Sequence, residues 1–112
     1  MSITAKTLIS AHFAVATDNT EYTAPASTKT IIDKFTATNT DTVARTITIN
    51  IVPSGGAVGA SSLILSAVSI AAGVTFDSTE MRNQILSAGD VISVKASAAG
   101  VVVIRASGRE IV

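Results

Sequence analysis

Few residues in this chain are of the types that catalyse reactions. There is one histidine, His12, and no cysteine, which excludes a thiol nucleophile, a disulfide and a zinc-thiolate site. A histidine that acts as a general base needs an orienting partner and a nucleophile, and no motif around His12 supplies them. No group of His and carboxylate residues has the spacing of metal ligands. We therefore expect no catalytic, cofactor-binding or metal-binding residues, no cofactor and no enzymatic activity.

One glycine-rich stretch could suggest a phosphate-binding loop. Gly55-Gly56-Ala57-Val58-Gly59 lacks the Lys-Ser/Thr pair that follows the glycines of such a loop, and no helical pattern begins after it. Glycines that permit positive φ in a turn explain the stretch better. The low-complexity segment around it, residues 54–62, predicts a flexible hairpin loop or an extended arm.

Asp33 is the one residue that interrupts a strand pattern. It shares a predicted strand face with Ile31 and Phe35, where alternation calls for an apolar side chain. A charge in that position needs a partner, or a place at a sheet edge or subunit contact. An inward charge on an edge strand also prevents unwanted pairing. We expect a structural role for Asp33.

The composition suits a structural β protein. Thr and Ser occupy 28 of the 112 positions and Ala another 18, whereas aromatic residues make up only 4%. Small side chains bury little area each, so association with further subunits would add burial that a thin core lacks. Eight basic and eight acidic residues cancel without a basic patch, which argues against nucleic acid binding.

Membrane insertion and export are not indicated either. No stretch approaches 18 consecutive apolar residues, and the first residues lack the apolar region of a secretory signal. We expect a soluble protein that is not exported by that route.

Hydrophobic periodicity predicts strands throughout the chain. Residues 46–51 alternate, with Ile47, Ile49 and Ile51 on one face, and residues 90–97 place Ile92, Val94 and Ala96 inward. In residues 7–15 the apolar set is Ile9, Ala11, Phe13 and Val15, which leaves His12 as a solvent or interface side chain. The other predicted strands are residues 30–38, 62–70, 80–86 and 101–107.

Turn residues separate these strands, at residues 17–20, 39–41, 53–56, 72–73, 88–90 and 99–100. About seven or eight short strands at this spacing predict a single antiparallel β-sandwich, jelly-roll-like, that forms one domain over residues 1–112. Only residues 78–86 have a helical alternative. There Ser78 would cap one turn, with Met81 and Ile85 on one face, but a strand over residues 80–86 is our prediction.

Four segments of the chain resemble a pattern in small virion proteins of tailed bacteriophages and prophages. Residues 21–32 contain Tyr22-Thr23-Ala24-Pro25 and lead into residues 35–40, which close on Asn39-Thr40. In that pattern a Tyr-Thr-x-Pro-x segment likewise leads into a strand that ends at Asn-Thr. Further matches are residues 88–94, which begin Ala88-Gly89-Asp90, and residues 107–111. Together they span most of the chain from Glu21 onward.

The resemblance implies a β-sandwich virion protein with no enzymatic role, assembled in the host cytoplasm and present in many copies on the particle. Its partners would be itself, as a homo-oligomer of which a trimer is one option, and capsid or tail proteins, with no nucleic acid or membrane. Decoration or stabilisation of the capsid is the preferred role. The alternatives are a head-tail or tail and collar structural component, and a receptor- or carbohydrate-binding module of the tail.

Overall fold

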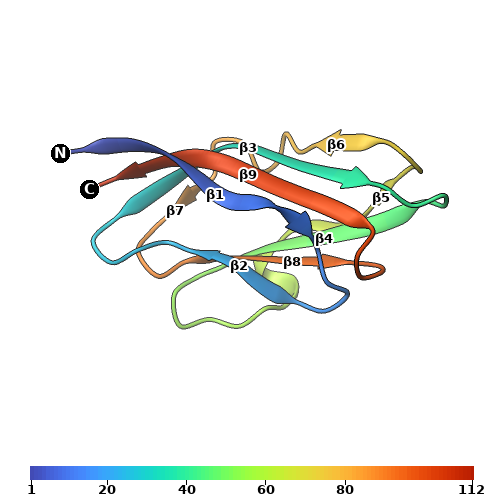
Figure 1. Ribbon diagram of the computed structural model, residues 1–112. Coiled ribbons are helices and arrows are strands. Elements are labelled where there is room, and N and C mark those ends of the chain that lie inside the picture. Colours follow the sequence, from blue (N-terminus) through green and yellow to red (C-terminus); the bar gives the residue numbers. More distant parts are fainter.

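Two antiparallel β-sheets lie face to face in the computed structural model, which describes residues 1–112 (Figure 1). Sheet A contains, in spatial order, β1 (Ile3–Phe13), β9 (Val102–Ile111), β3 (Lys29–Asn39) and β6 (Thr75–Asp77), and β7 (Ile85–Leu86) also pairs with β3. Sheet B contains β2 (Asn19–Thr23), β8 (Val91–Ala96), β4 (Arg45–Val52) and β5 (Leu63–Ile70). The predicted all-β sandwich is confirmed, with nine strands.

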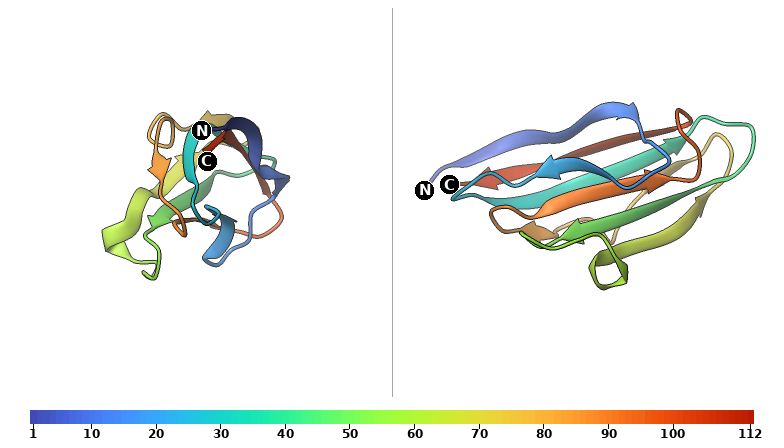
Figure 2. Two further views of the ribbon diagram at one scale, coloured as in Figure 1. Left: turned by 90° about the vertical axis from the view of Figure 1, so that its left-hand side faces the viewer. Right: turned by 90° about the horizontal axis from the view of Figure 1, so that it is seen from below.

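The strand pairings are nested within one another. β4 pairs with β5, β3 with β6 and β7, β2 with β8, and β1 with β9. The chain therefore has the pairing of one long hairpin. This hairpin is rolled up so that β3 also pairs with β9 and β4 also pairs with β8. This is the predicted jelly-roll topology. Figure 2 shows that the strands run along the long axis of a molecule measuring 46 × 27 × 20 Å.

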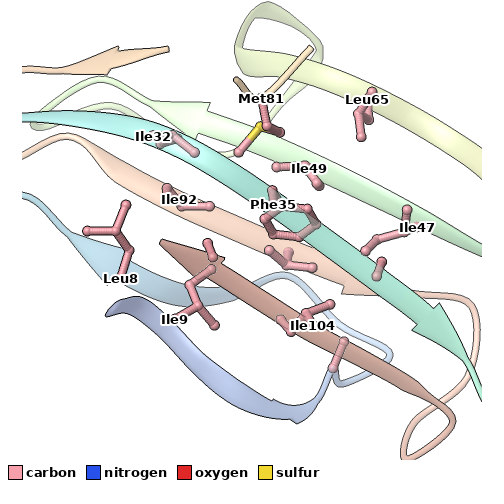
Figure 3. Close-up of a cluster of buried hydrophobic side chains, with 14 of the residues drawn as sticks. Leu8, Ile9, Ile32, Phe35, Ile47, Ile49, Leu65, Met81, Ile92 and Ile104 are labelled. Carbon is pink, nitrogen blue, oxygen red and sulfur yellow. The ribbon is translucent and has the colours of Figure 1, made fainter. Parts of the chain in front are cut away.

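The core lies between the sheets and is built from the inward side chains of both. Phe35 of β3 is fully buried and lies at the centre of the cluster, beside Ile47 and Ile49 of β4 (Figure 3). Ile92 and Val94 of β8 are also fully buried, as their alternation predicts. Each fully buried side chain of this size contributes about 1.5–3 kcal/mol to folding.

β-bulges change the pattern in β1. The register between β1 and β9 shifts twice, so that Leu8 and Ile9, although consecutive, are both buried. Phe13 and Val15 lie beyond the bulges and are 49% and 39% exposed. The predicted apolar face of Ile9, Ala11, Phe13 and Val15 is therefore wrong beyond Ile9, because simple alternation does not allow for an extra residue in the strand.

A bulge in β3 explains Asp33. The register between β3 and β9 shifts between Ile32 and Lys34, and Asp33 is the extra residue. Its side chain is consequently exposed on the outer face of sheet A, while Ile32 and Phe35 both point into the core. Gly108 lies opposite Ile32 at this point.

The predicted strand over residues 80–86 is wrong. The chain turns through residues 79–83, and only Ile85 and Leu86 pair with β3. The Ser78 hydroxyl accepts a hydrogen bond from the Met81 amide at 3.1 Å, which stabilises the turn, and Met81 is fully buried. The helical alternative, with Ser78 as a cap, is closer to what is found, although Ile85 is 60% exposed.

The remaining six predicted strands match observed ones, but two short strands were not predicted. β2 begins inside the predicted turn at residues 17–20, and β6 has only three residues. The segment at residues 54–62 is a hairpin loop between β4 and β5, as predicted, and not an extended arm. It contains one 3-10 turn, η1 (Ala60–Ser62), and the Asn50 side chain holds it through hydrogen bonds to Gly59 O and Ser62 Oγ, both of 3.0 Å.

We predict that Gly108→Ala destabilises the protein by about 3 kcal/mol, at the upper end of overpacking costs. A Cβ at Gly108 would overlap the carbonyl oxygen of Ile31 and lie 2.8 Å from Leu8 Cδ1. The matched control is Gly59→Ala, because Gly59 has an extended φ of −179° and nothing within 4 Å of its Cβ position. Denaturant unfolding of both variants is the measurement, and equal midpoints would contradict this account of the bulge.

Candidate interaction site

Both termini lie at one end of the sandwich (Figures 1 and 2). A partly buried polar cluster joins the two sheets at that end. Tyr22 of β2, in sheet B, donates a hydrogen bond of 2.6 Å to Glu110 Oε2 of β9, in sheet A. Its hydroxyl also lies 2.7 Å from Thr30 Oγ1 of β3. Because the single phenol proton is given to Glu110, the Thr30 hydroxyl donates to Tyr22. Lys6 Nζ lies 3.5 Å from the other carboxylate oxygen of Glu110.

The cluster controls the ionisation of Tyr22. The pKa of Tyr22 is raised from 10.0 to about 12, first by burial and next by the hydrogen bond to Glu110, whereas the bond from Thr30 lowers this pKa in part. The phenol is therefore neutral at physiological pH and remains the donor to Glu110. Its role is to bridge the sheets.

The turns next to this cluster connect further parts of the chain. The Ala24 amide donates to Asp90 O, and the Gly89 amide donates to Ala24 O, both at 2.9 Å. The Asp90 carboxylate accepts from the backbone amides of Ser54 and Ser87, at 3.0 and 2.9 Å. Gly89 has a φ of +85°, which glycine adopts without strain. Residues 22–30, 87–90 and 108–110 thus meet at one end of the fold.

His12 is placed at the junction of β1 and β2. Its side chain is 46% exposed, as the solvent-facing prediction requires, and its Nε2 lies 2.8 Å from Glu21 Oε1. The Glu21 side chain is only 5% exposed and also accepts from Asn19 Nδ2 at 3.0 Å. Glu21 was not singled out in the sequence, because its partner lies on a strand of the other sheet.

Asp33 is paired, which is one of its two predicted outcomes. Arg109 of β9 donates to both carboxylate oxygens of Asp33, with distances of 2.8 to 3.1 Å. The hydrogen bond from Arg109 to Asp33 raises the pKa of the guanidinium above its ordinary value. The alternative of an edge position is wrong, because β3 lies between β9 and β6.

An apolar patch lies on the outer face of sheet A at the same end as the termini. Ile3 of β1 pairs with Ile111 of β9, and Ile31 of β3 pairs with Ile85 of β7. Ile3 and Ile85 are 56% and 60% exposed, and Val112 beside them is 66% exposed. We call these five residues the apolar end patch. Lys29 pairs with Ile111 and Arg109 pairs with Ile31, so two charged residues lie among these apolar side chains. A group of exposed apolar side chains with a polar surround is typical of a surface for protein contacts.

No family model, curated protein or solved structure matches the chain. No group of three or more His, Asp or Glu side chains is arranged to hold a metal ion. The fold contains no helix of the length and apolarity needed to cross a membrane.

We predict that Tyr22 titrates with a pKa of about 12, visible as phenolate absorbance, because folding buries its hydroxyl beside Glu110. The folded-state pKa of Tyr22 lies above its ordinary value of 10.0. The stability that the neutral Tyr22 hydroxyl contributes is therefore fully present below pH 10.0, and it is lost as the pH rises from there through about 12. Tyr22 is the only tyrosine and there is no tryptophan, so the signal belongs to one group. In Glu110→Gln the pKa should fall but stay raised by burial. An ordinary pKa in the folded wild-type protein would contradict the cluster.

Proposed function

We propose that this protein is a non-enzymatic structural component of a tailed-bacteriophage virion, a homo-oligomeric accessory protein that decorates or stabilises the capsid. The observation that carries this proposal is that the separate segments resembling phage virion proteins form one bonded unit. Tyr22 from the first segment donates to Glu110 from the last, although 88 positions separate them. Ala24 and Gly89, from the first and the middle segments, are joined through the backbone.

Convergence in space makes a chance resemblance less plausible. Short motifs that match by accident have no reason to lie together in the fold. Here the tyrosine, the Ala-Gly-Asp turn and the closing Gly-Arg-Glu stretch support each other at one end of the sandwich. Among the matching residues, Tyr22, Thr30 and Glu110 connect sheet B to sheet A, and Ala24 and Gly89 join the turns beside β2 and β8.

The topology is consistent with this role. Jelly rolls occur in viral capsid domains, and also in lectins and cupins, so the fold by itself does not choose among them. The aromatic residues favour the structural role over sugar binding. Phe35 is fully buried, Phe76 packs against the core and Tyr22 bridges the sheets, which leaves Phe13 as the one aromatic ring with large exposure. Sugar sites rely on exposed aromatic rings with convergent polar groups.

The apolar end patch supports assembly into larger structures. Its exposed side chains would be covered by a second copy or by another virion protein. Repetition of one subunit around a symmetric particle makes weak contacts sufficient, because linked copies bind with avidity. A homo-oligomer, with a trimer as one option, fits this arrangement.

The test is to prepare particles from the phage or prophage that encodes this chain, with its gene deleted, and to add the purified protein back. We expect it to occupy defined symmetric positions on the capsid, seen by image reconstruction. The variant Ile3→Asp/Ile85→Asp, which charges two exposed positions of the apolar end patch, should bind the particle less than wild type. The control Val58→Asp charges an exposed residue outside the patch and should bind as wild type does.

Other outcomes would replace the proposal. Occupancy on the tail, collar or head-tail joint would assign the alternative structural position. Binding to host-surface glycans without binding to particles would assign a recognition module of the tail. If particles assemble normally without this protein and do not bind it when it is added, the proposed virion role is contradicted.

A further inference from the structure

The outer face of sheet A carries a polar trough on β3 and β9. The cross-strand register places Arg105 opposite Thr36 and Ser107 opposite Lys34. The four side chains form a square in which the two cations occupy one diagonal and the two hydroxyls the other. They line a hollow of about 240 Å³ that has no hydrophobic residue in its wall. At about 30 Å³ for each water molecule, this space accommodates a small polar group and its hydration.

Of the two cations of the trough, Arg105 has no carboxylate partner and Lys34 has only a distant, shared one. Both side chains are exposed, and no carboxylate lies within ion-pair distance of Arg105. Lys34 Nζ is 3.9 Å from Asp77 Oδ2, but the same oxygen bonds to Arg82 at closer range. Diagonal neighbours on paired strands are roughly 7–8 Å apart, so the two like charges repel each other. Without a ligand this arrangement does not help the fold.

Acidic residues bound the trough on two sides. Asp77 of β6 lies opposite Thr36, and Asp33 lines a second hollow that shares Ser107 with the first. Each of these carboxylates already has an arginine, Arg82 and Arg109 respectively. Both flanks of the trough are therefore charge-balanced ion pairs, and the remaining positive charge is confined to Lys34 and Arg105, which suits one compact anion.

We propose that this trough binds a single carboxylate side chain of a partner polypeptide, which lies between Lys34 and Arg105 and accepts hydrogen bonds from the hydroxyls of Thr36 and Ser107. Arginine supplies a planar pair of donors that matches a carboxylate, and lysine adds a point charge. This inference does not rest on the proposed virion function, because the trough would bind such a carboxylate on any partner protein.

A polypeptide fits the trough better than nucleic acid does. Proteins that hold single strands combine a long basic groove with aromatic rings on which the bases stack, and the trough has two cations and no aromatic residue. The ion pairs of Asp33 and Asp77 on its two sides add no further unpaired cation for a row of phosphates. A glutamate or aspartate on a protein loop brings one charge and neutral neighbours.

The test is a titration of the labelled protein followed by backbone amide chemical shifts. The probe is a five-residue capped peptide, Gly-Ser-Glu-Ser-Gly, and its control is the same peptide with Gln for Glu. We expect shifts at residues 34–36 and 105–107 with the Glu peptide only, at millimolar concentrations. Lys34→Gln and Arg105→Gln should each weaken binding about three- to fivefold. Lys29→Gln makes the same charge change elsewhere on β3 and should leave binding unaltered.

Thermal unfolding separates binding from a structural role. Arg105→Gln should leave the melting temperature unchanged or raise it, since it removes repulsion from Lys34. A clear loss of stability in this variant would mean that the cation serves the fold, and would overturn the proposal. So would equal shifts with the Gln peptide, equal weakening by Lys29→Gln, or no shift at the trough. Tighter binding of inorganic phosphate or of a thymidine tetranucleotide than of the Glu peptide would assign the trough to phosphates instead.

Discussion

Sheet A depends on β9, because β1 and β3 each pair with β9 and do not pair with each other. The same strand carries an inward stripe of Val102, Ile104 and Ala106 that contributes to the core. It also carries Gly108, which leaves room for Leu8 and the β3 bulge, and Glu110, which receives the hydrogen bond from the opposite sheet. Its outward side chains include Arg105, Ser107 and Arg109. Core packing, the connection between sheets and the polar outer face therefore rest on a single strand.

Several of the buried polar side chains connect parts of the backbone or the two sheets. Near the termini, Tyr22, Thr30 and Glu110 satisfy one another. At the β3–β4 corner, Asn39 is fully buried and its amide donates to Val43 O and Ile70 O, both at 2.9 Å. Because an unpaired buried group costs about 1–3 kcal/mol, such groups specify one arrangement of the strands. Mainly Ile and Leu side chains, with Phe35, Met81 and several Ala and Val residues, fill the core between the sheets, and the hydrogen-bonded polar groups fix how the strands are arranged.

Alternation along the chain predicts the regular strands well and the irregular ones poorly. β4 and β8 follow a period of two, and their inward residues Ile49 and Val94 are where the pattern places them. β1 and β3 contain bulges, which depend on pairing with β9, a strand far away in sequence. The turn at residues 79–83 escaped prediction because its apolar residue Met81 is buried by tertiary packing and not by membership of a strand.

The candidate sites were less predictable than the fold. The position of Asp33 in the strand pattern predicts that its carboxylate needs a partner. Identifying Arg109 as that partner requires the register between β3 and β9. The polar trough likewise becomes visible only when Lys34 and Ser107 are set opposite each other. Residues about 70 positions apart in the chain become neighbours through cross-strand pairing, and a single sequence has no signal for that.

The nested pairing also has a consequence for the growing chain on the ribosome. β4 and β5 are close in sequence and can form their hairpin early, whereas β1 is made about 90 residues before its partner β9. At about 5–20 residues per second, β1 waits roughly 5–20 s with unpaired backbone groups. Lys6 and His12 within β1 are polar interruptions that discourage pairing with other nascent chains during this wait. This order of synthesis favours assembly from the innermost hairpin outward, with the strand synthesised earliest among the last to pair.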